Sequence, residues 1–196
     1  MGGWFILIEV RFHGRGGQGV VTAADLLAVA GFKEGYWTLS FPMFGAEKRG
    51  TPVVSYLRIS DRPIVERDEI YNPNYVVVLD PTVIGPVRVE AGIKENGMII
   101  ANYPKSAEEL RKEHFSNLNS SIKILTLNAT KMAMDVLGRP ITNTAMVGAF
   151  AGATKLIKLS TLKETVLEWF EEKGEEIAKK NAELVEKAYK EMEGKA

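Results

Sequence analysis

Cysteine is absent from the 196-residue chain, and this absence excludes more than any other feature of the composition. Without thiolates the chain offers no disulfide, no reactive thiol and no cysteine-bound zinc, and it lacks the four ligands that an iron–sulfur cluster normally takes. Histidine is almost as scarce, because only His13 and His114 occur, in unrelated contexts. We therefore expect no metal site in this chain.

Long apolar runs and an excess of one charge are also missing. No stretch of about 18 apolar residues is present, so we expect no transmembrane span. The 25 basic and 25 acidic residues cancel, which gives no electrostatic case for nucleic acid. The first residues do not resemble an export signal, so we expect a cytoplasmic protein. The richness in Glu and Lys, together with the lack of cysteine, suits a thermophilic source.

No catalytic constellation stands out in the sequence. There is no Ser-His-Asp pattern, no carboxylate pair with an evident acid role, and no Gly-Asp-Gly followed by the asparagine of a thiamine diphosphate site. Asp80 follows an apolar strand, where α/β folds usually build sites, but Asp before Pro is also a common turn former. We therefore predict no catalytic residue.

The pattern of apolar residues predicts one α/β domain over residues 1–196. Strands are expected at 5–12, 36–41, 52–59, 75–80, 97–101 and 122–127, and helices at 20–30, 106–114, 130–137, 144–156 and 161–190. Glycine inside a helix costs about 1 kcal/mol, so the last helix should break near Gly174. Ser106 with Glu109, and Thr161 with Glu164, predict capping boxes. Continuous apolar strands are typical of sheets covered on both faces, which favours a three-layer α/β/α fold with a mostly parallel or mixed sheet and a helical C-terminal third.

A glycine-dense turn between the first strand and the first helix is the most informative motif. It contains Gly14, Arg15, Gly16, Gly17, Gln18 and Gly19. Backbone N–H groups of such a turn and the dipole of the following helix form an anion cradle. The G-x-G-x-x-G spacing alone is weak evidence for a dinucleotide, and the acidic residue that should end the second strand is missing. A site for another phosphate or carboxylate group and a purely structural role in strand–helix packing both stay open.

The long loop at 42–51 combines apolar and charged residues. Its candidate binding residues are Phe44, Gly45, Glu47, Lys48 and Arg49. Hydrogen bonds to charged groups contribute about 1.5–3 kcal/mol and a helix terminus only about 0.3–1 kcal/mol, so Arg15 with Lys48 or Arg49 would supply most of the affinity for a phosphate. Alternatively, Glu47 and Arg49 pair locally and only hold the loop.

Asn143 and Thr144 stand at the expected start of a helix, where they are either simple N-caps or ligand contacts. The following residues 148–153 are mostly Gly and Ala. Such a surface lets another backbone approach closely, and it leaves open whether that backbone is the chain's own sheet or a neighbouring subunit.

Five segments together carry a resemblance to a known family. The 14–19 turn, the stretch 41–52 (FPMFGAEKRGTP), the strand and Asp-Pro at 70–81, the stretch 143–149 (NTAMVGA) and the stretch 180–183 (KNAE) occur in this order over nearly the whole chain. They closely resemble the gamma subunit of the 2-oxoacid:ferredoxin oxidoreductases, the pyruvate synthase type of enzyme that acts on pyruvate, ketoisovalerate and related acids.

The resemblance implies a subunit that is inactive in isolation and binds no cofactor alone. In this family partner chains bind thiamine diphosphate with magnesium, a ferredoxin-like chain carries iron–sulfur clusters, and coenzyme A accepts the acyl group. The expected partners are the alpha, beta and delta subunits, with ferredoxin as the acceptor of the complex. The resemblance further implies that this subunit caps the assembly and helps to receive coenzyme A. From the chemistry of the residues, we expect the coenzyme A contacts in Gly14–Gly19 and Phe44–Arg49, with Asn143 and Thr144 as further candidates. A stand-alone Rossmann-like oxidoreductase and a pure scaffold subunit are the alternatives.

Overall fold

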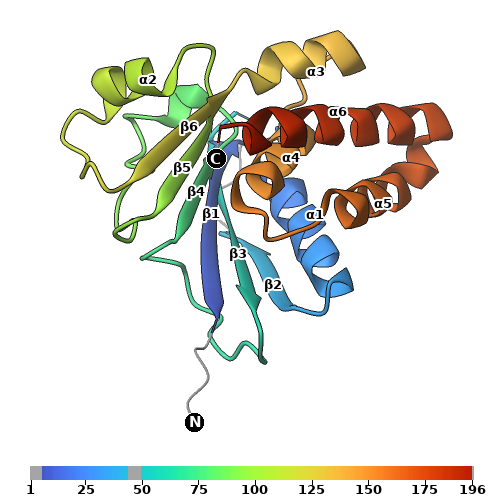
Figure 1. The fold of residues 1–196 in the computed structure, drawn as a ribbon, viewed down its shortest axis with the longest axis horizontal. Helices are drawn as coiled ribbons and strands as arrows, with labels where there is room; N and C mark the ends of the chain where they lie inside the picture. Colours follow the sequence, from blue (N-terminus) through green and yellow to red (C-terminus); the bar gives the residue numbers. More distant parts are fainter. Residues whose placement is uncertain (1–5, 44–49, 196) are drawn as a thin grey trace.

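The computed structural model describes residues 6–43 and 50–195. Strands and helices follow one another in the manner of an α/β fold (Figure 1). The strands are β1 (Leu7–Arg15), β2 (Trp37–Pro42), β3 (Pro52–Ser60), β4 (Tyr75–Val78), β5 (Met98–Asn102) and β6 (Lys123–Leu127). The α-helices are α1 (Val20–Lys33), α2 (Ala107–His114), α3 (Ala129–Leu137), α4 (Asn143–Thr154), α5 (Leu159–Phe170) and α6 (Glu175–Glu193), and the short 3₁₀ helices are η1 (Pro81–Val83) and η2 (Glu171–Lys173).

One six-stranded sheet organises the molecule, with the strand order β2-β3-β1-β4-β5-β6. Strands β1, β4, β5 and β6 pair in parallel, whereas β3 is antiparallel to both β1 and β2. The prediction of a mixed sheet is confirmed. Strand β3 separates β2 from β1, whereas in a dinucleotide-binding unit the second strand lies directly beside the first.

A layer made of α1, α3, α4, α5 and α6 covers one face of the sheet (Figure 1). Helix α4 lies inside this layer, and every residue from Asn143 to Ala153 is buried. A Cβ atom added at Gly148 would lie 2.3 Å from the carbonyl oxygen of Val185, and one at Gly152 would lie 2.3 Å from that of Tyr189. The backbone that approaches the small residues of α4 is therefore helix α6 of the same chain.

The opposite face is covered by α2 and by irregular segments of the chain (Figure 1). Leu110 of α2 packs with Val76, Val78 and Ile99 of the central strands. This second layer completes the α/β/α arrangement that the sequence predicts.

Two buried arginines hold irregular segments on this second face. Arg11 of β1 donates hydrogen bonds to the carbonyl oxygens of Val89 (2.8 Å) and Ala91 (2.6 Å). Arg58 of β3 donates to the carbonyl oxygens of Glu66 (3.1 Å) and Asp68 (2.9 Å). The guanidinium groups thus donate hydrogen bonds to carbonyl oxygens in segments outside the helices and strands. This role could not be predicted from the sequence.

The predicted helix ends are confirmed in part. Ser106 and Glu109 form the expected capping box at the start of α2. The break near Gly174 is also present, because η2 and a glycine with φ of 106° separate α5 from α6. The second predicted capping box is wrong: α5 begins at Leu159, so Thr161 lies inside the helix and its carbonyl oxygen accepts a hydrogen bond from Thr165 Oγ1.

Candidate functional site

The strongest structural candidate for a site is the carboxyl end of the parallel pair β1 and β4. The chain leaves β1 toward the layer of α1 and leaves β4 toward the opposite layer, where Val83 of η1 is buried. A crevice opens where neighbouring parallel strands connect to opposite faces, and open α/β sheets usually bind ligands there. The 14–19 turn and the segment 80–82 border this position.

The positions of the turn require glycine for different structural reasons. Gly17 and Gly19 adopt left-handed conformations, with φ of 89° and 74°. A Cβ atom at Gly14 would lie 2.6 Å from Val20 Cγ2, so close strand–helix packing does explain this glycine. Gly16 donates its N–H to the carbonyl oxygen of Thr51 (2.9 Å), whereas the N–H groups of Gly17 and Gly19 donate to no other residue in the part of the chain that the structure describes. The turn therefore keeps free donors beside the N-terminus of α1.

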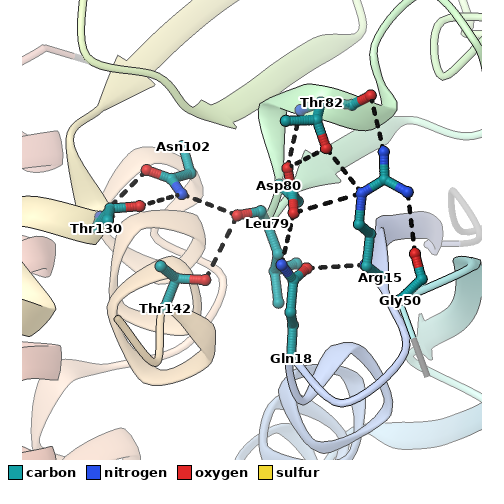
Figure 2. A network of polar contacts seen from close by, with 9 residues as sticks. All are labelled: Arg15, Gln18, Gly50, Leu79, Asp80, Thr82, Asn102, Thr130 and Thr142. Carbon is teal, nitrogen blue, oxygen red and sulfur yellow. Dashed lines mark hydrogen bonds and ion pairs between the residues drawn. The ribbon is translucent and has the colours of Figure 1, made fainter. Parts of the chain in front are cut away.

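Gln18 and Asp80 connect the turn to the end of β4 (Figure 2). Gln18 Oε1 accepts the N–H of Arg15 (2.8 Å), and Gln18 Nε2 donates to Asp80 Oδ2 (2.5 Å). Asp80 Oδ1 accepts the N–H and the hydroxyl of Thr82. Burial raises the pKa of Asp80, but the hydrogen bonds from Gln18 and Thr82 and the charge of Arg15 outweigh it, so the pKa is lower than usual. Asp80 thus acts as an ionised anchor of two loops.

Arg15 is already engaged within the molecule (Figure 2). Its Nε donates to Thr82 Oγ1 (2.7 Å) and its Nη1 donates to the carbonyl oxygen of Gly50 (3.0 Å). Among the described residues, the nearest carboxylate oxygen is Asp80 Oδ2, which lies 3.7 Å from Nε, and 31% of the Arg15 side chain is exposed. The guanidinium therefore fastens Gly50 to the Asp80 turn and stays partly exposed.

Asn143 joins this site and Thr144 does not. Asn143 is the first residue of α4, and a Cβ atom at Gly19 would lie 2.4 Å from its Nδ2. Its Oδ1 accepts the N–H of Thr144 (2.8 Å). The N-cap interpretation of Asn143 and Thr144 is wrong, because Thr142 is the N-cap residue of α4. Thr144 is completely buried and donates its hydroxyl to Asn181 Oδ1 of α6 (2.9 Å).

The candidate residues Phe44, Gly45, Glu47, Lys48 and Arg49 lie outside the described residues. The residues on either side are attached to the site and the sheet. Gly50 donates its N–H to the carbonyl oxygen of Gly16 (3.2 Å), and Met43 donates to the carbonyl oxygen of Val54 (3.0 Å).

Sequence reasoning missed a second polar cluster around the carbonyl oxygen of Leu79 (Figure 2). Asn102 Nδ2 donates to this oxygen and to Thr130 Oγ1, both at 2.9 Å, and Thr142 Oγ1 also donates to the Leu79 oxygen (3.4 Å). The signal was present in the sequence, since Asn102 directly follows an apolar strand at the same edge of the sheet as Asp80. This cluster fixes the ends of β4 and β5 relative to α3 and α4.

Comparison with known proteins decides the family. The family model described as pyruvate ferredoxin/flavodoxin oxidoreductase matches residues 9–191. The chain belongs to this family.

Similar proteins of the pyruvate ferredoxin/flavodoxin oxidoreductase family cover almost the whole chain. The present chain is 46% identical over 183 residues to the pyruvate/ketoisovalerate oxidoreductases common subunit gamma of Thermococcus kodakarensis. The aligned region covers 93% of this chain and 96% of that protein. The crystal structure of pyruvate oxidoreductase subunit PORC from Thermotoga maritima superposes with a TM-score of 0.81 and 30% identity, covering 94% of this chain and 96% of the other. A 2-oxoglutarate:ferredoxin oxidoreductase from Magnetococcus marinus shares the fold, with a TM-score of 0.78, 20% identity and coverage of 97% of this chain but 31% of that one.

Within the family the chain is a gamma subunit, and it is part of an enzyme as one chain of an oxidoreductase complex. The comparisons give no support to a stand-alone dinucleotide-binding oxidoreductase. The position of β3 between β1 and β2 agrees with this outcome.

Two further properties concern metals and membranes. Over residues 6–43 and 50–195, no three His, Cys, Asp or Glu side chains lie together as a metal ion would require. Within the same ranges, no helix is both long and apolar enough to cross a membrane.

Proposed function

We propose that this gamma subunit takes part in binding coenzyme A in a CoA-acylating 2-oxoacid:ferredoxin oxidoreductase. The 14–19 turn carries the proposal, because it presents the free N–H groups of Gly17 and Gly19 at the end of β1. The N-terminus of α1 adds a favourable dipole, and backbone donors at such a terminus are a common phosphate site. The Asn143 side chain lies beside Gly19 and borders the turn.

Arg15 would add most of the electrostatic attraction for a coenzyme A phosphate. Its guanidinium has no carboxylate oxygen closer than 3.7 Å among the described residues, so its charge is only partly neutralised. A hydrogen bond to a charged group contributes about 1.5–3 kcal/mol, more than the helix terminus alone. Lys48 and Arg49, from the stretch between Met43 and Gly50, are the other expected contacts.

The remaining chemistry belongs to partner chains. We propose alpha and beta subunits that hold thiamine diphosphate and magnesium, a ferredoxin-like delta subunit with iron–sulfur clusters, and ferredoxin as the electron acceptor. This chain has no cysteine with which to bind a cluster. It would cap the assembly, and the isolated chain would be inactive. Support comes from the shared fold of the 2-oxoglutarate:ferredoxin oxidoreductase that was solved with coenzyme A bound.

The test uses two substitutions of Arg15 in the assembled enzyme. Arg15→Ala removes charge and hydrogen bonds, and we expect the apparent KM for coenzyme A to rise about tenfold, which corresponds to about 1.4 kcal/mol. Arg15→Lys keeps the charge but not the planar fork that reaches Thr82 and Gly50. If charge is the contribution, Arg15→Lys should retain most of the affinity for coenzyme A.

Arg88→Ala is the matched control, because Arg88 is an exposed arginine that pairs only with Glu90 among the described residues. It should leave the KM for coenzyme A unchanged. A pure scaffold subunit would instead show normal coenzyme A kinetics after substitution of Arg15, Lys48 and Arg49, with assembly intact. That result would refute the proposed role.

A further inference from the structure

A groove lies in the helical layer where the ends of α3, α4, α5 and α6 meet. Figure 1 shows the hairpin of α5 and α6 that borders this region. It encloses about 450 Å³, a volume typical of small-molecule sites. Trp169 of α5, Ile141 before α4 and Ile177 of α6 line it with exposed fractions of 38%, 43% and 45%. These side chains give the groove a partly apolar wall with one accessible aromatic ring.

Basic side chains predominate around the groove. Arg139, Lys173 and Lys180 line it, opposed by the single carboxylate of Glu176, which pairs with Lys180 at 2.7 Å. The Lys173 ammonium lies 5.1 Å from the centre of the Phe170 ring. The Arg139 side chain forms no hydrogen bond or ion pair with any other described residue. The groove therefore has a net positive charge and favours an anion.

An unused donor on the groove wall points to a ligand independently of this charge. Asn143 is 94% buried, since 6% of its surface is exposed. Its Oδ1 accepts the N–H of Thr144, which fixes the orientation of the amide, and its Nδ2 donates to no residue in the described ranges. No fully buried side-chain nitrogen or oxygen there lacks a partner, so Nδ2 must reach solvent. A ligand atom in the groove would replace water as the acceptor of this donor.

We propose that this groove binds the phosphorylated adenosine portion of a nucleotide, a chemistry common to coenzyme A and to free adenine nucleotides. The base would stack on Trp169, because aromatic side chains bind the flat face of any base. The phosphates would meet Arg139, Lys173 and Lys180, and Asn143 Nδ2 would donate to an acceptor of the ligand. This assignment goes beyond the role of the 14–19 turn, and only its extension to coenzyme A rests on the proposed function.

The fluorescence of Trp169 provides a direct test on the full chain. The sequence contains three tryptophans, so Trp4→Phe with Trp37→Phe leaves Trp169 as the single reporter. We expect adenosine 3′,5′-bisphosphate to change its emission saturably, and calorimetry on the natural chain to give the same affinity. Lys180→Ala should weaken binding about tenfold, as expected for loss of one charged contact.

Lys187→Ala is a close control, because Lys187 and Glu183 form the same i,i+4 pair on α6 as Lys180 and Glu176 but lie outside the groove. Equal losses in both variants would show unspecific attraction and would overturn the proposal, as would the absence of saturable binding by both methods. Binding of ADP as tight as that of the bisphosphate would assign the groove to free nucleotides, whereas preference for the bisphosphate would assign it to coenzyme A. If Arg15→Ala raises the KM for coenzyme A but the groove binds no nucleotide, the groove proposal alone fails.

Discussion

The two faces of the sheet are covered in different ways. On one face, helices pack through apolar and small residues, and α4 and α6 approach so closely that two glycines leave no room for a Cβ atom. On the other face, over β1 and β3, buried Arg11 and Arg58 hold irregular chain by donating hydrogen bonds to carbonyl oxygens. The first arrangement depends on shape and excluded volume, and the second depends on satisfying polar groups that burial removes from water.

The closeness of α4 and α6 gives the largest expected effect. Alanine normally stabilises a helix by about 1 kcal/mol relative to glycine, but overpacking of a core costs about 1–3 kcal/mol. Here the added Cβ atoms would clash with the backbone of α6, which cannot move aside as a flexible side chain can. We expect Gly148→Ala with Gly152→Ala to lower the free energy of unfolding by about 3–4 kcal/mol, measured by chemical denaturation.

Gly194→Ala at the end of α6 is the control, because the nearest atom to its added Cβ is 3.7 Å away. It should be neutral or slightly stabilising. A gain in stability from the Gly148 and Gly152 substitutions would mean that α4 and α6 are not in tight contact, and the comparison between the two faces would lose its basis.

Removal of Arg11 tests the second face. Arg11→Met leaves the carbonyl oxygens of Ile70, Val89 and Ala91 without this donor, at about 1–3 kcal/mol for each buried acceptor. Part of this loss is offset, because the variant no longer bears the free-energy cost of desolvating a buried guanidinium. We therefore expect a net loss of about 2–3 kcal/mol in the free energy of unfolding, with faster proteolysis within residues 61–94.

Arg88→Met serves as the comparison, since 81% of the Arg88 side chain is exposed. It should change stability by less than about 0.5 kcal/mol, as is usual for surface positions. Equal stability of the Arg11 and Arg88 variants would show that the irregular segments hold their place without the buried arginine.

The same contrast explains what could be predicted from the sequence. The periodicity of apolar residues is a local property of the sequence, so the strands, the helices and the mixed α/β sheet could be predicted from it. The α4 glycines indicated a close backbone contact but not its partner, because the partner Val185 is 37 residues away in a charged helix. Arg11 looked like any polar residue of an alternating strand, since its acceptors are carbonyl oxygens and every residue carries one.

The candidate site shows the same division. Gly14 and Gly19 were correctly expected to form a tight turn, and Asn143 does lie against Gly19. That Arg15 contributes to phosphate binding stays a prediction, and the sequence did not indicate that its guanidinium reaches Thr82 and Gly50. A turn motif fixes backbone shape locally, whereas the direction of a long side chain depends on acceptors that folding brings from elsewhere.

A third effect should appear as a pH dependence of the face that Arg11 occupies. Burial, with a smaller contribution from the charge of Arg11, lowers the pKa of His13 to about 3, and His13 Nε2 accepts a hydrogen bond from Arg11 Nε (3.0 Å). The unfolded chain regains a histidine pKa of about 6.5, so it binds the proton first as the pH falls and the folded state loses stability below that value. Relative to His13→Gln, which cannot titrate, the natural chain should lose up to about 1.4 kcal/mol for each pH unit between about 6 and 4, measured by denaturation at several pH values. His114→Gln, at an exposed position, should keep the pH dependence of the natural chain. A natural chain that follows the same pH profile as His13→Gln would place His13 in contact with water and contradict the tight cover that the arginines provide.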